Sequence, residues 1–271
     1  QVVRRKVSAV TRSARKRCIL GILERSGLPS LGYEASTAAD ASIYRTVLER
    51  TGLYGRHDGD WRWSHPDEVT DAAMAKVWRK LEIFFSVPDG VPKCFEQLID
   101  DLLAPPIGLR EGVVPILVAA GLVAFGRALA LRERVDGGLR YVDDIQPSVI
   151  EALCETPGRF ELEVAPLTSD DLRSLERMIG CFTGELDSQE PDRVRGFYDA
   201  LLEWRAGLPP TAFSTRGLGK GADLLQPMIR RKNFDPMTFL LKNLPQAVGA
   251  KPFSKTTVAL FEQAVEEMEG V

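Results

Sequence analysis

The sequence has few of the side chains that metal sites and disulfide frameworks require. It contains two histidines, His57 and His65, and no Cys-x-x-Cys pair. Its four cysteines stand far apart, at Cys18, Cys94, Cys154 and Cys181. A structural zinc site is therefore not expected, and widely spaced single cysteines are typical of buried thiols in a reducing cytoplasm. We expect a cytoplasmic protein with no metal and no other cofactor in this chain.

Long hydrophobic runs are also missing. In the most apolar stretch, PPIGLREGVVPILVAAGLVAF at residues 105–125, the thirteen residues from Val113 to Phe125 carry no charge, and Arg110, Glu111 and Arg127 bracket them, whereas a membrane-spanning helix needs ~20 apolar residues. The basic first twenty residues lack the apolar segment and cleavage site of a signal peptide. Because the sequence starts with Gln1 rather than Met, we expect a fragment or a processed product. No membrane is expected among its partners.

The sequence carries no complete catalytic motif. The one phosphate-loop lookalike, GLGKGAD at residues 217–223, has Gly221 where a Walker loop needs a hydroxyl after Lys220, and Ser214 where that loop needs its first glycine. No Gly-x-Ser-x-Gly elbow is present. We therefore predict a flexible loop, no nucleotide binding, no catalytic residue and no enzyme in this chain.

Two further patterns leave alternatives open. Paired acids could bind a metal, but helix capping and solvated faces explain such pairs more often. Similarly, His57 and His65 flank two tryptophans. One interpretation is that these histidines act as a metal ligand or a base. The other is that they belong to a loop packed by the tryptophans. The paired acids are Asp100-Asp101, Asp143-Asp144 and Asp170-Asp171.

The net charge of −3 is unevenly distributed. Residues 1–90 carry +4, residues 91–166 carry −5 and residues 167–271 carry −2. The basic N-terminal helix and a basic C-terminal loop are therefore the candidate nucleic-acid contacts, with a solvated helix face or docking on an acidic neighbour as the alternative. The candidate contacts are Arg4, Arg5, Arg12, Arg15, Lys16, Arg17, Arg216, Lys220, Arg230 and Arg231.

Hydrophobic periodicity predicts a mostly α fold. It indicates an N-terminal helix over residues 3–25, with Val3, Val7, Val10, Ala14 and Cys18 on one face, followed by further helices up to the VPDGVP break. Alternating residues on both sides of an Asp-Gly-Gly turn predict a β-hairpin over residues 129–141. We therefore expect helical bundle segments around a winged-helix-like α+β middle domain, with domains at residues 1–90, 91–166 and 167–271.

The helix-helix-hairpin order of residues 91–166 is typical of a winged-helix module. In that fold the apolar stretch would form the core under the hairpin. A DNA-reading helix in this place needs polar and basic side chains, whereas this stretch is apolar and its segment is acidic. A packing or partner-facing role is the first interpretation, and DNA contact is the second. A local basic patch for DNA would consist of Arg110, Arg127, Arg132, Arg134 and Arg140.

Three stretches together resemble a known family. They are RRKVSAVTRSARKRCILGILERSG with SIYRTVLERTGLYG, then LLAPPIGLREGVVPILVAAGLVAFGRALALRERVDGGLRYVDDIQPSVIEALCETPGRFELEVAPL, and LPPTAFSTRGLGKGADLLQPMIRRKNFDPMTFLLKNLPQAVG. They are similar to the non-catalytic region of large bacterial anti-phage defence ATP-binding proteins, such as the P-loop protein of BREX systems. The resemblance implies helical and winged-helix segments behind an ATPase domain. It implies no ATP hydrolysis here, since the Walker motifs are missing.

Three functions remain open on the sequence. The first is a non-enzymatic interaction or regulatory module of a large defence ATPase, which packs on the ATPase core or on a partner subunit. The second is a sequence-nonspecific DNA-binding module that uses the basic N-terminal helix and the basic C-terminal loop. The third is a hydrolase whose site has no motif.

Overall fold

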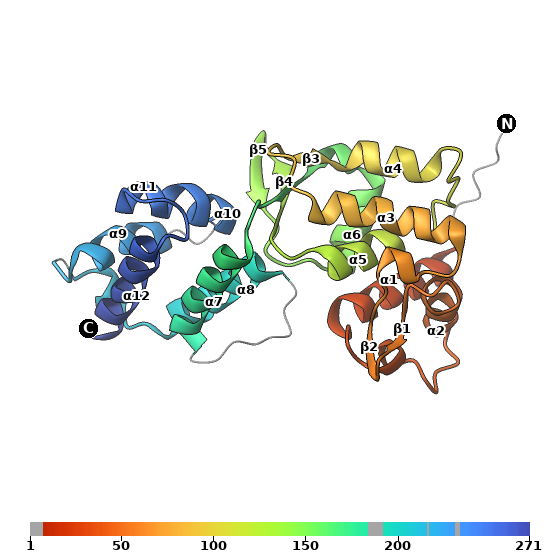
Figure 1. Cartoon of the computed structure of the whole chain (residues 1–271), viewed down its shortest axis with the longest axis horizontal. Coiled ribbons are helices and arrows are strands. Elements are labelled where there is room, and N and C mark those ends of the chain that lie inside the picture. The colour runs from red at the N-terminus through yellow and green to blue at the C-terminus, as the bar shows by residue number, and fades with distance from the viewer. Residues whose placement is uncertain (1–7, 184–191, 216, 231–233) are drawn as a thin grey trace. The chain divides into compact units, whose positions relative to one another are not determined.

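The computed structural model describes residues 8–183, 192–215, 217–230 and 234–271. It is mostly helical with two small antiparallel sheets (Figure 1), which confirms the expected fold class. The chain divides into two compact units. The first comprises Gln1–Val87, Pro92–Gly126 and Asp144–Glu161, and the second comprises Pro88–Val91, Arg127–Asp143 and Leu162–Val271.

The first unit is built from helices and one short hairpin. Its longer helices are α1 (Ala9–Glu24), α3 (Ala72–Ser86), α4 (Phe95–Leu103), α5 (Val114–Phe125) and α6 (Pro147–Glu155). Its shorter elements are η1 (Pro29–Gly32), α2 (Ala39–Tyr44), η2 (Arg45–Glu49), η3 (Pro66–Glu68), β3 (Lys93–Cys94) and η4 (Pro157–Arg159). The hairpin consists of β1 (Tyr54–His57) and β2 (Asp60–Trp63).

Helix α1 begins later than the periodicity predicts, and of the predicted apolar face Ala14 and Cys18 are buried. Ser8 caps it by accepting a hydrogen bond from the Thr11 amide at 3.2 Å. Val10, expected on the apolar face, is 74% exposed, so this part of the prediction is wrong. The helix packs against α2, α5 and α6, and its buried residues start only at Ala14, one turn further on. Val3 and Val7 lie outside the described residues.

Helix α5 carries the apolar stretch, and it is a buried core helix. Every residue from Val114 to Gly121 is buried, and the helix packs against α1, α3 and α6. A Cβ atom added at Gly121 would lie 3.1 Å from Leu81 and Phe85, so the glycine allows α5 to approach α3 closely. Among the residues that the structure describes, no helix has both the length and the apolar character needed to cross a membrane.

The second unit consists of the predicted hairpin and a set of helices. The hairpin is β4 (Leu129–Val135) with β5 (Gly138–Tyr141). Strand β6 (Phe160–Val164), which belongs to this unit from Leu162 onward, lies beside β4. The helices are α7 (Ser169–Thr183), α8 (Arg193–Gly207), η5 (Pro210–Phe213), α9 (Lys220–Ile229), α10 (Pro236–Thr238), η6 (Phe239–Asn243), α11 (Leu244–Val248) and α12 (Lys255–Glu269).

The hairpin has the turn that its sequence predicts. Strands β4 and β5 are antiparallel, with Val135 opposite Gly138. Asp136 and Gly137 both have positive φ, 48° and 80°, which is the backbone that Asp-Gly favours in a two-residue turn. The predicted β-hairpin is therefore confirmed.

The two compact units do not follow the boundaries expected at residues 90 and 166. Helices α4, α5 and α6 belong to the first unit, whereas the β4–β5 hairpin belongs to the second. The physical reason is that the apolar faces of α5 pack on α1 and α3. The three-domain division and the winged-helix assignment stay predictions.

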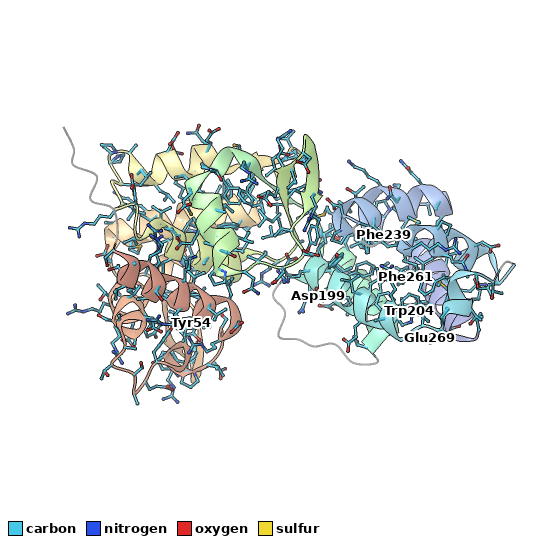
Figure 2. The ribbon with its side chains drawn as sticks, turned by 180° about the vertical axis from the view of Figure 1, so that it is seen from behind. Tyr54, Asp199, Trp204, Phe239, Phe261 and Glu269 are labelled. Atoms are coloured by element: carbon cyan, nitrogen blue, oxygen red, sulfur yellow. The ribbon has the colours of Figure 1, made fainter. Side chains whose placement is uncertain are left out.

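Aromatic side chains dominate the core of the second unit. The ring of Phe197 stacks on Phe239 at 5.9 Å, and Phe182 contacts the rings of Trp204 at 5.1 Å and Phe261 at 5.5 Å. Figure 2 shows Trp204 next to Glu269 of α12, whose carboxylate accepts the indole hydrogen bond at 2.8 Å. These contacts hold α7, α8 and α12 together.

Candidate binding surfaces

Three of the candidate cations on α1 face solvent. Arg12, Lys16 and Arg17 are exposed. Part of the Arg17 charge is already matched, because its Nε lies 3.4 Å from Asp40 Oδ1 in an ion pair without hydrogen-bond geometry. The basic surface that α1 offers to a phosphate backbone is therefore mainly Arg12 and Lys16.

Arg15 is a correction to the candidate contacts. Its side chain is buried, and it donates two hydrogen bonds to Glu151 of α6, from Nε to Oε1 at 2.6 Å and from Nη2 to Oε2 at 2.5 Å. Its Nη1 also donates to the carbonyl of Gly112 at 3.5 Å. A phosphate would have to break this buried, bidentate pair, so Arg15 is removed from the candidate nucleic-acid contacts.

The basic patch proposed for the middle segment also loses a member. Arg132 on β4 is buried and forms ion pairs with Glu163 at 2.7 Å and with Asp235. These partners fix the guanidinium inside the second unit. Arg132 therefore contributes no free charge to a DNA-facing surface, and the physical reason is its burial between two carboxylates.

Of the C-terminal candidates, Arg230 is the one whose side chain the structure describes. It is exposed at the end of α9, and its guanidinium donates to the carbonyl of Phe213. Lys220 is the first residue of α9. Four candidates lie outside the described residues: Arg4, Arg5, Arg216 and Arg231.

The phosphate-loop lookalike ends at a helix start that is already occupied. The backbone amide of Ala222, in the first turn of α9, donates to Oε2 of Glu267 at 3.1 Å. A Walker loop binds phosphate at such a helix N-terminus. Here a carboxylate from α12 takes that place, which would repel a phosphate group and agrees with the expectation of no nucleotide binding.

Arg230 lines a groove of about 530 Å³ in the second unit. Arg205 from the last turn of α8 also lines it, and its Nη2 donates to the Arg230 carbonyl at 3.3 Å. The groove combines two guanidinium groups with apolar side chains. We call it the arginine groove, and its lining residues are Leu202, Arg205, Ala206, Phe213 and Arg230.

The sequence candidates include Arg230 but not Arg205. Arg205 is the basic residue in the last turn of α8, and a cation at a helix C-terminus has an ordinary explanation in the helix dipole. The available signal was its place between Leu202 and Ala206, which put apolar side chains on the same side of the helix. That signal is weak without the tertiary position of Phe213.

His57 and Ser64 lie within hydrogen-bond distance of each other, but their roles are reversed for catalysis. The Ser64 hydroxyl donates to the Gly52 carbonyl at 2.6 Å. A hydroxyl has one proton, so Nε2 of His57, 3.0 Å from the Ser64 Oγ, must donate rather than accept. A nucleophilic serine needs its histidine to accept the proton. This pair therefore fixes the hairpin and does not activate Ser64.

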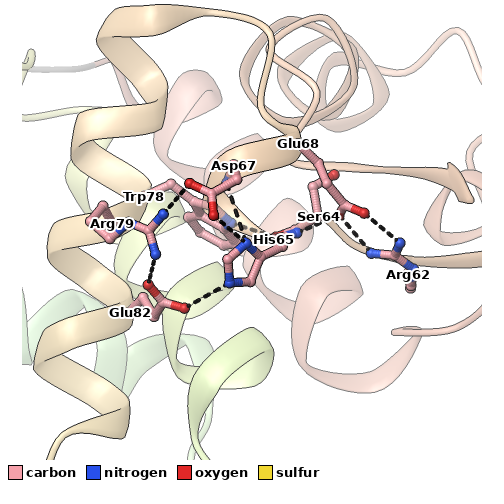
Figure 3. A network of polar contacts seen from close by, with 8 residues as sticks. All are labelled: Arg62, Ser64, His65, Asp67, Glu68, Trp78, Arg79 and Glu82. Carbon is pink, nitrogen blue, oxygen red and sulfur yellow. Dashed lines mark hydrogen bonds and ion pairs between the residues drawn. The ribbon is translucent and has the colours of Figure 1, made fainter.

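His65 lies in a polar network that ties η3 to α3 (Figure 3). Its Nδ1 lies 3.3 Å from Asp67 and its Nε2 lies 3.4 Å from Glu82. Arg79 also contacts both carboxylates. Trp78 adds a hydrogen bond to the Ser64 carbonyl at 2.8 Å. His65 thus takes part in the polar contacts that join η3 to α3, with the Asp67 and Glu82 carboxylates as its partners.

Glu68 in the same network completes a capping box. It accepts two hydrogen bonds from Arg62, both at 2.8 Å, and one from the His65 amide at 2.6 Å. The hydrogen bonds from Arg62, and then that of the His65 amide, lower the pKa of Glu68 to about 2. The charged form is thus favoured, and this contribution to stability is present above the ordinary glutamate pKa and lost as pH falls toward 2.

Three of the four thiols are poor nucleophiles in this protein. Of the cysteines expected to be buried, Cys18 is buried, Cys154 and Cys181 are half-buried, and Cys94 is exposed, so the expectation is wrong for Cys94. Burial raises the pKa of Cys18 to about 12, with the Asp40 carboxylate as the second cause. Burial and Glu151 likewise raise the pKa of Cys154 to about 12, and burial raises that of Cys181 to about 11. A thiolate is the reactive form of cysteine, so these three thiols stay protonated near neutral pH.

The paired acids follow the capping and ion-pair interpretation. Asp171 accepts hydrogen bonds from Thr168 at the start of α7, and Asp101 pairs with Lys80 at 2.7 Å. Within the described ranges, no group of three or more potential metal ligands comes together. The structure thus accounts for two of these pairs without a metal.

Comparison with known proteins adds no identity. No protein-family model, no curated protein and no solved structure matches this sequence.

Proposed function

We propose that this chain is a non-enzymatic interaction module that holds an acidic segment of a neighbouring domain or subunit in the arginine groove. The resemblance to the P-loop protein of BREX systems suggests that the neighbour belongs to a bacterial anti-phage defence ATPase. The observation that carries the proposal is that Arg205 and Arg230 line one groove together with apolar side chains.

The chemistry of the groove selects the partner. A guanidinium group forms bidentate hydrogen bonds with a carboxylate, and these are stronger than bonds between neutral groups. Phe213 and Leu202 supply apolar surface beside the charges, and interface affinity concentrates where an apolar side chain is buried next to such anchors. The fitting partner therefore has Asp or Glu next to Leu, Phe or Trp.

Charge reversal in the groove tests this function. A short fluorescein-labelled peptide in which Asp and Glu alternate with Leu and Phe should bind the protein in an anisotropy titration. Arg205→Glu with Arg230→Glu should weaken binding about tenfold or more, because hydrogen bonds to charged groups contribute ~1.5–3 kcal/mol each. Arg173→Glu on the exposed face of α7 reverses one charge away from the groove and is the control, to be compared with each single groove variant, Arg205→Glu and Arg230→Glu. Equal loss in the control would mean non-specific attraction and would contradict the proposal.

A second candidate function is sequence-nonspecific DNA binding by α1, favoured by the exposure of Arg12, Lys16 and Arg17. Phosphate contacts position a protein without reading sequence. Replacing all three residues with alanine is expected to weaken DNA binding and to reduce the salt slope by up to ~3, since each neutralised phosphate contributes ~0.9. Anisotropy with unrelated duplexes at two salt concentrations measures both effects.

The control for the DNA experiment is Arg134→Ala in the exposed part of the hairpin. It removes one cation without touching the buried Arg132 pair. We expect it to change binding less than the α1 variant. Sequence-selective binding that survives the α1 changes and is lost in Arg134→Ala would make the hairpin the DNA-reading element instead.

A further inference from the structure

The second unit contains a small aromatic pocket that is separate from the arginine groove and shares no residue with it. Its volume is about 130 Å³, well below the ~300–1,000 Å³ of a typical metabolite site. It has room for the end of one side chain. The lining residues used here are Arg140, Tyr141, Asp143, Tyr198, Phe234 and Asp235.

Three aromatic rings form one side of this pocket. Tyr198 is buried and contacts two other rings, with centroids 5.1 Å from Tyr141 and 5.3 Å from Phe234. The planes are inclined by 61° and 51°, so the two neighbouring rings turn away from the plane of Tyr198. Tyr198 is 2% exposed, so the half-buried rings of Tyr141 and Phe234 are the ones that can offer a π face to a cation.

Asp143 supplies the carboxylate that a cation would need. Its backbone carbonyl accepts a hydrogen bond from Arg195 at 3.2 Å, but its carboxylate oxygens have no hydrogen bond or ion pair among the described residues. Asp235 is engaged already, since Oδ2 pairs with Arg132 and Oδ1 caps Thr238 at 2.9 Å. Asp143 is thus the acceptor that remains open to a ligand.

Charged groups of both signs lie near the rings. Burial raises the pKa of Tyr198, the Asp143 and Asp199 carboxylates raise it further, and the Arg205 and Arg140 guanidinium groups lower it. The same carboxylates would stabilise a positive group placed against the ring. Arg140 is the opposing charge, because it is exposed on β5 and lines the same pocket.

We propose that the aromatic pocket binds the guanidinium group of an arginine side chain on a partner protein. A guanidinium is flat, stacks on aromatic faces and donates several hydrogen bonds in one plane, so it can contact the half-buried Tyr141 and Phe234 rings and Asp143 together. An ammonium group is more strongly hydrated and lacks the planar fork. The interaction therefore discriminates arginine from lysine.

Arginine-containing pentapeptides test this site in a titration of ¹⁵N-labelled protein followed by NMR. Ac-Gly-Gly-Arg-Gly-Gly-amide should shift the amide signals of Tyr141, Asp143 and Tyr198. The peptide with citrulline, which keeps the shape and loses the charge, should bind about tenfold more weakly, as expected for a cation–π contact of 0.5–2 kcal/mol. The lysine peptide should also be weaker.

Three variants distinguish a cation site from other pockets. Asp143→Asn should weaken arginine binding, and Phe234→Leu, which keeps apolar bulk but removes the ring, should weaken it too. Arg140→Gln should strengthen it, because it removes the opposing charge. The spectrum of each variant shows whether the fold is intact. Equal binding of arginine and citrulline peptides, no shifts up to about 10 mM peptide, or weaker binding in Arg140→Gln would overturn the proposal.

Discussion

Replacing Arg15 with alanine is expected to lower the free energy of unfolding by about 3–5 kcal/mol. The substitution leaves the buried Glu151 carboxylate without either of its guanidinium hydrogen bonds. A charge that stays buried after losing its partner costs more than the pair contributes when intact. Denaturant titration of the variant and the wild type measures the change. The two free energies of unfolding are compared with the same dependence on denaturant concentration.

Two further variants show that the effect comes from the buried pair. Arg12→Ala removes an exposed cation from the same helix and should change stability by less than ~0.5 kcal/mol. Arg15→Met combined with Glu151→Leu removes both charges and should recover most of the loss, since buried ion pairs are often replaced by apolar residues at little cost. A loss below ~1 kcal/mol in Arg15→Ala would mean that water reaches Glu151.

Replacing Leu117 with alanine is expected to cost about 2–5 kcal/mol. Leu117 is fully buried in α5, at the centre of the helices that form the first unit. The smaller side chain removes apolar contacts and leaves a cavity that the packed helices only partly close. Chemical denaturation followed by circular dichroism measures this loss.

Val10→Ala is the control for the core variant. Val10 is 74% exposed on α1, so its replacement should alter stability by less than ~0.5 kcal/mol. A similarly small change for Leu117→Ala would contradict the placement of α5 in the core. It would mean that the apolar stretch meets solvent or an external partner instead.

Local signals in the sequence were sufficient for several parts of the fold. The Asp136-Gly137 turn has the positive φ angles that its hairpin needs, and Asp235 and Ser254, residue types that favour helix starts, cap α10 and α12. The uncharged run at 113–125 was recognised as too short for a membrane and forms a core helix. Each of these features depends on neighbours in the sequence.

Features that depend on distant residues could not be predicted in the same way. Arg15 looked like one more cation of a basic helix, because its partner Glu151 is 136 residues away. Val10 fits the helical period but is 74% exposed, and exposure depends on tertiary packing that the period does not record. The grouping of α5 with α1 and α3 likewise arises from packing that no local pattern records.

The candidate surfaces show the same limit. The sequence predicts Arg230 as a binding residue because it lies in a basic run. Arg205 becomes a candidate only in the folded structure, where it lines the arginine groove with Phe213. The aromatic pocket joins residues from β5, α8 and the segment before α10, so no spacing in the sequence connects Tyr141, Tyr198 and Phe234.

Selection from an oriented peptide library tests the proposed interaction function most directly. The protein is immobilised, a library with randomised positions is passed over it, and bound peptides are sequenced for the wild type, for Arg205→Glu with Arg230→Glu, and for the Arg173→Glu control. If the arginine groove binds acidic segments, peptides from the wild type and the control should be enriched in Asp and Glu next to Leu, Phe or Trp. The groove variant should lose that enrichment. Enrichment that is the same in all three proteins, or no enrichment of acidic residues in any of them, would contradict the proposed interaction function.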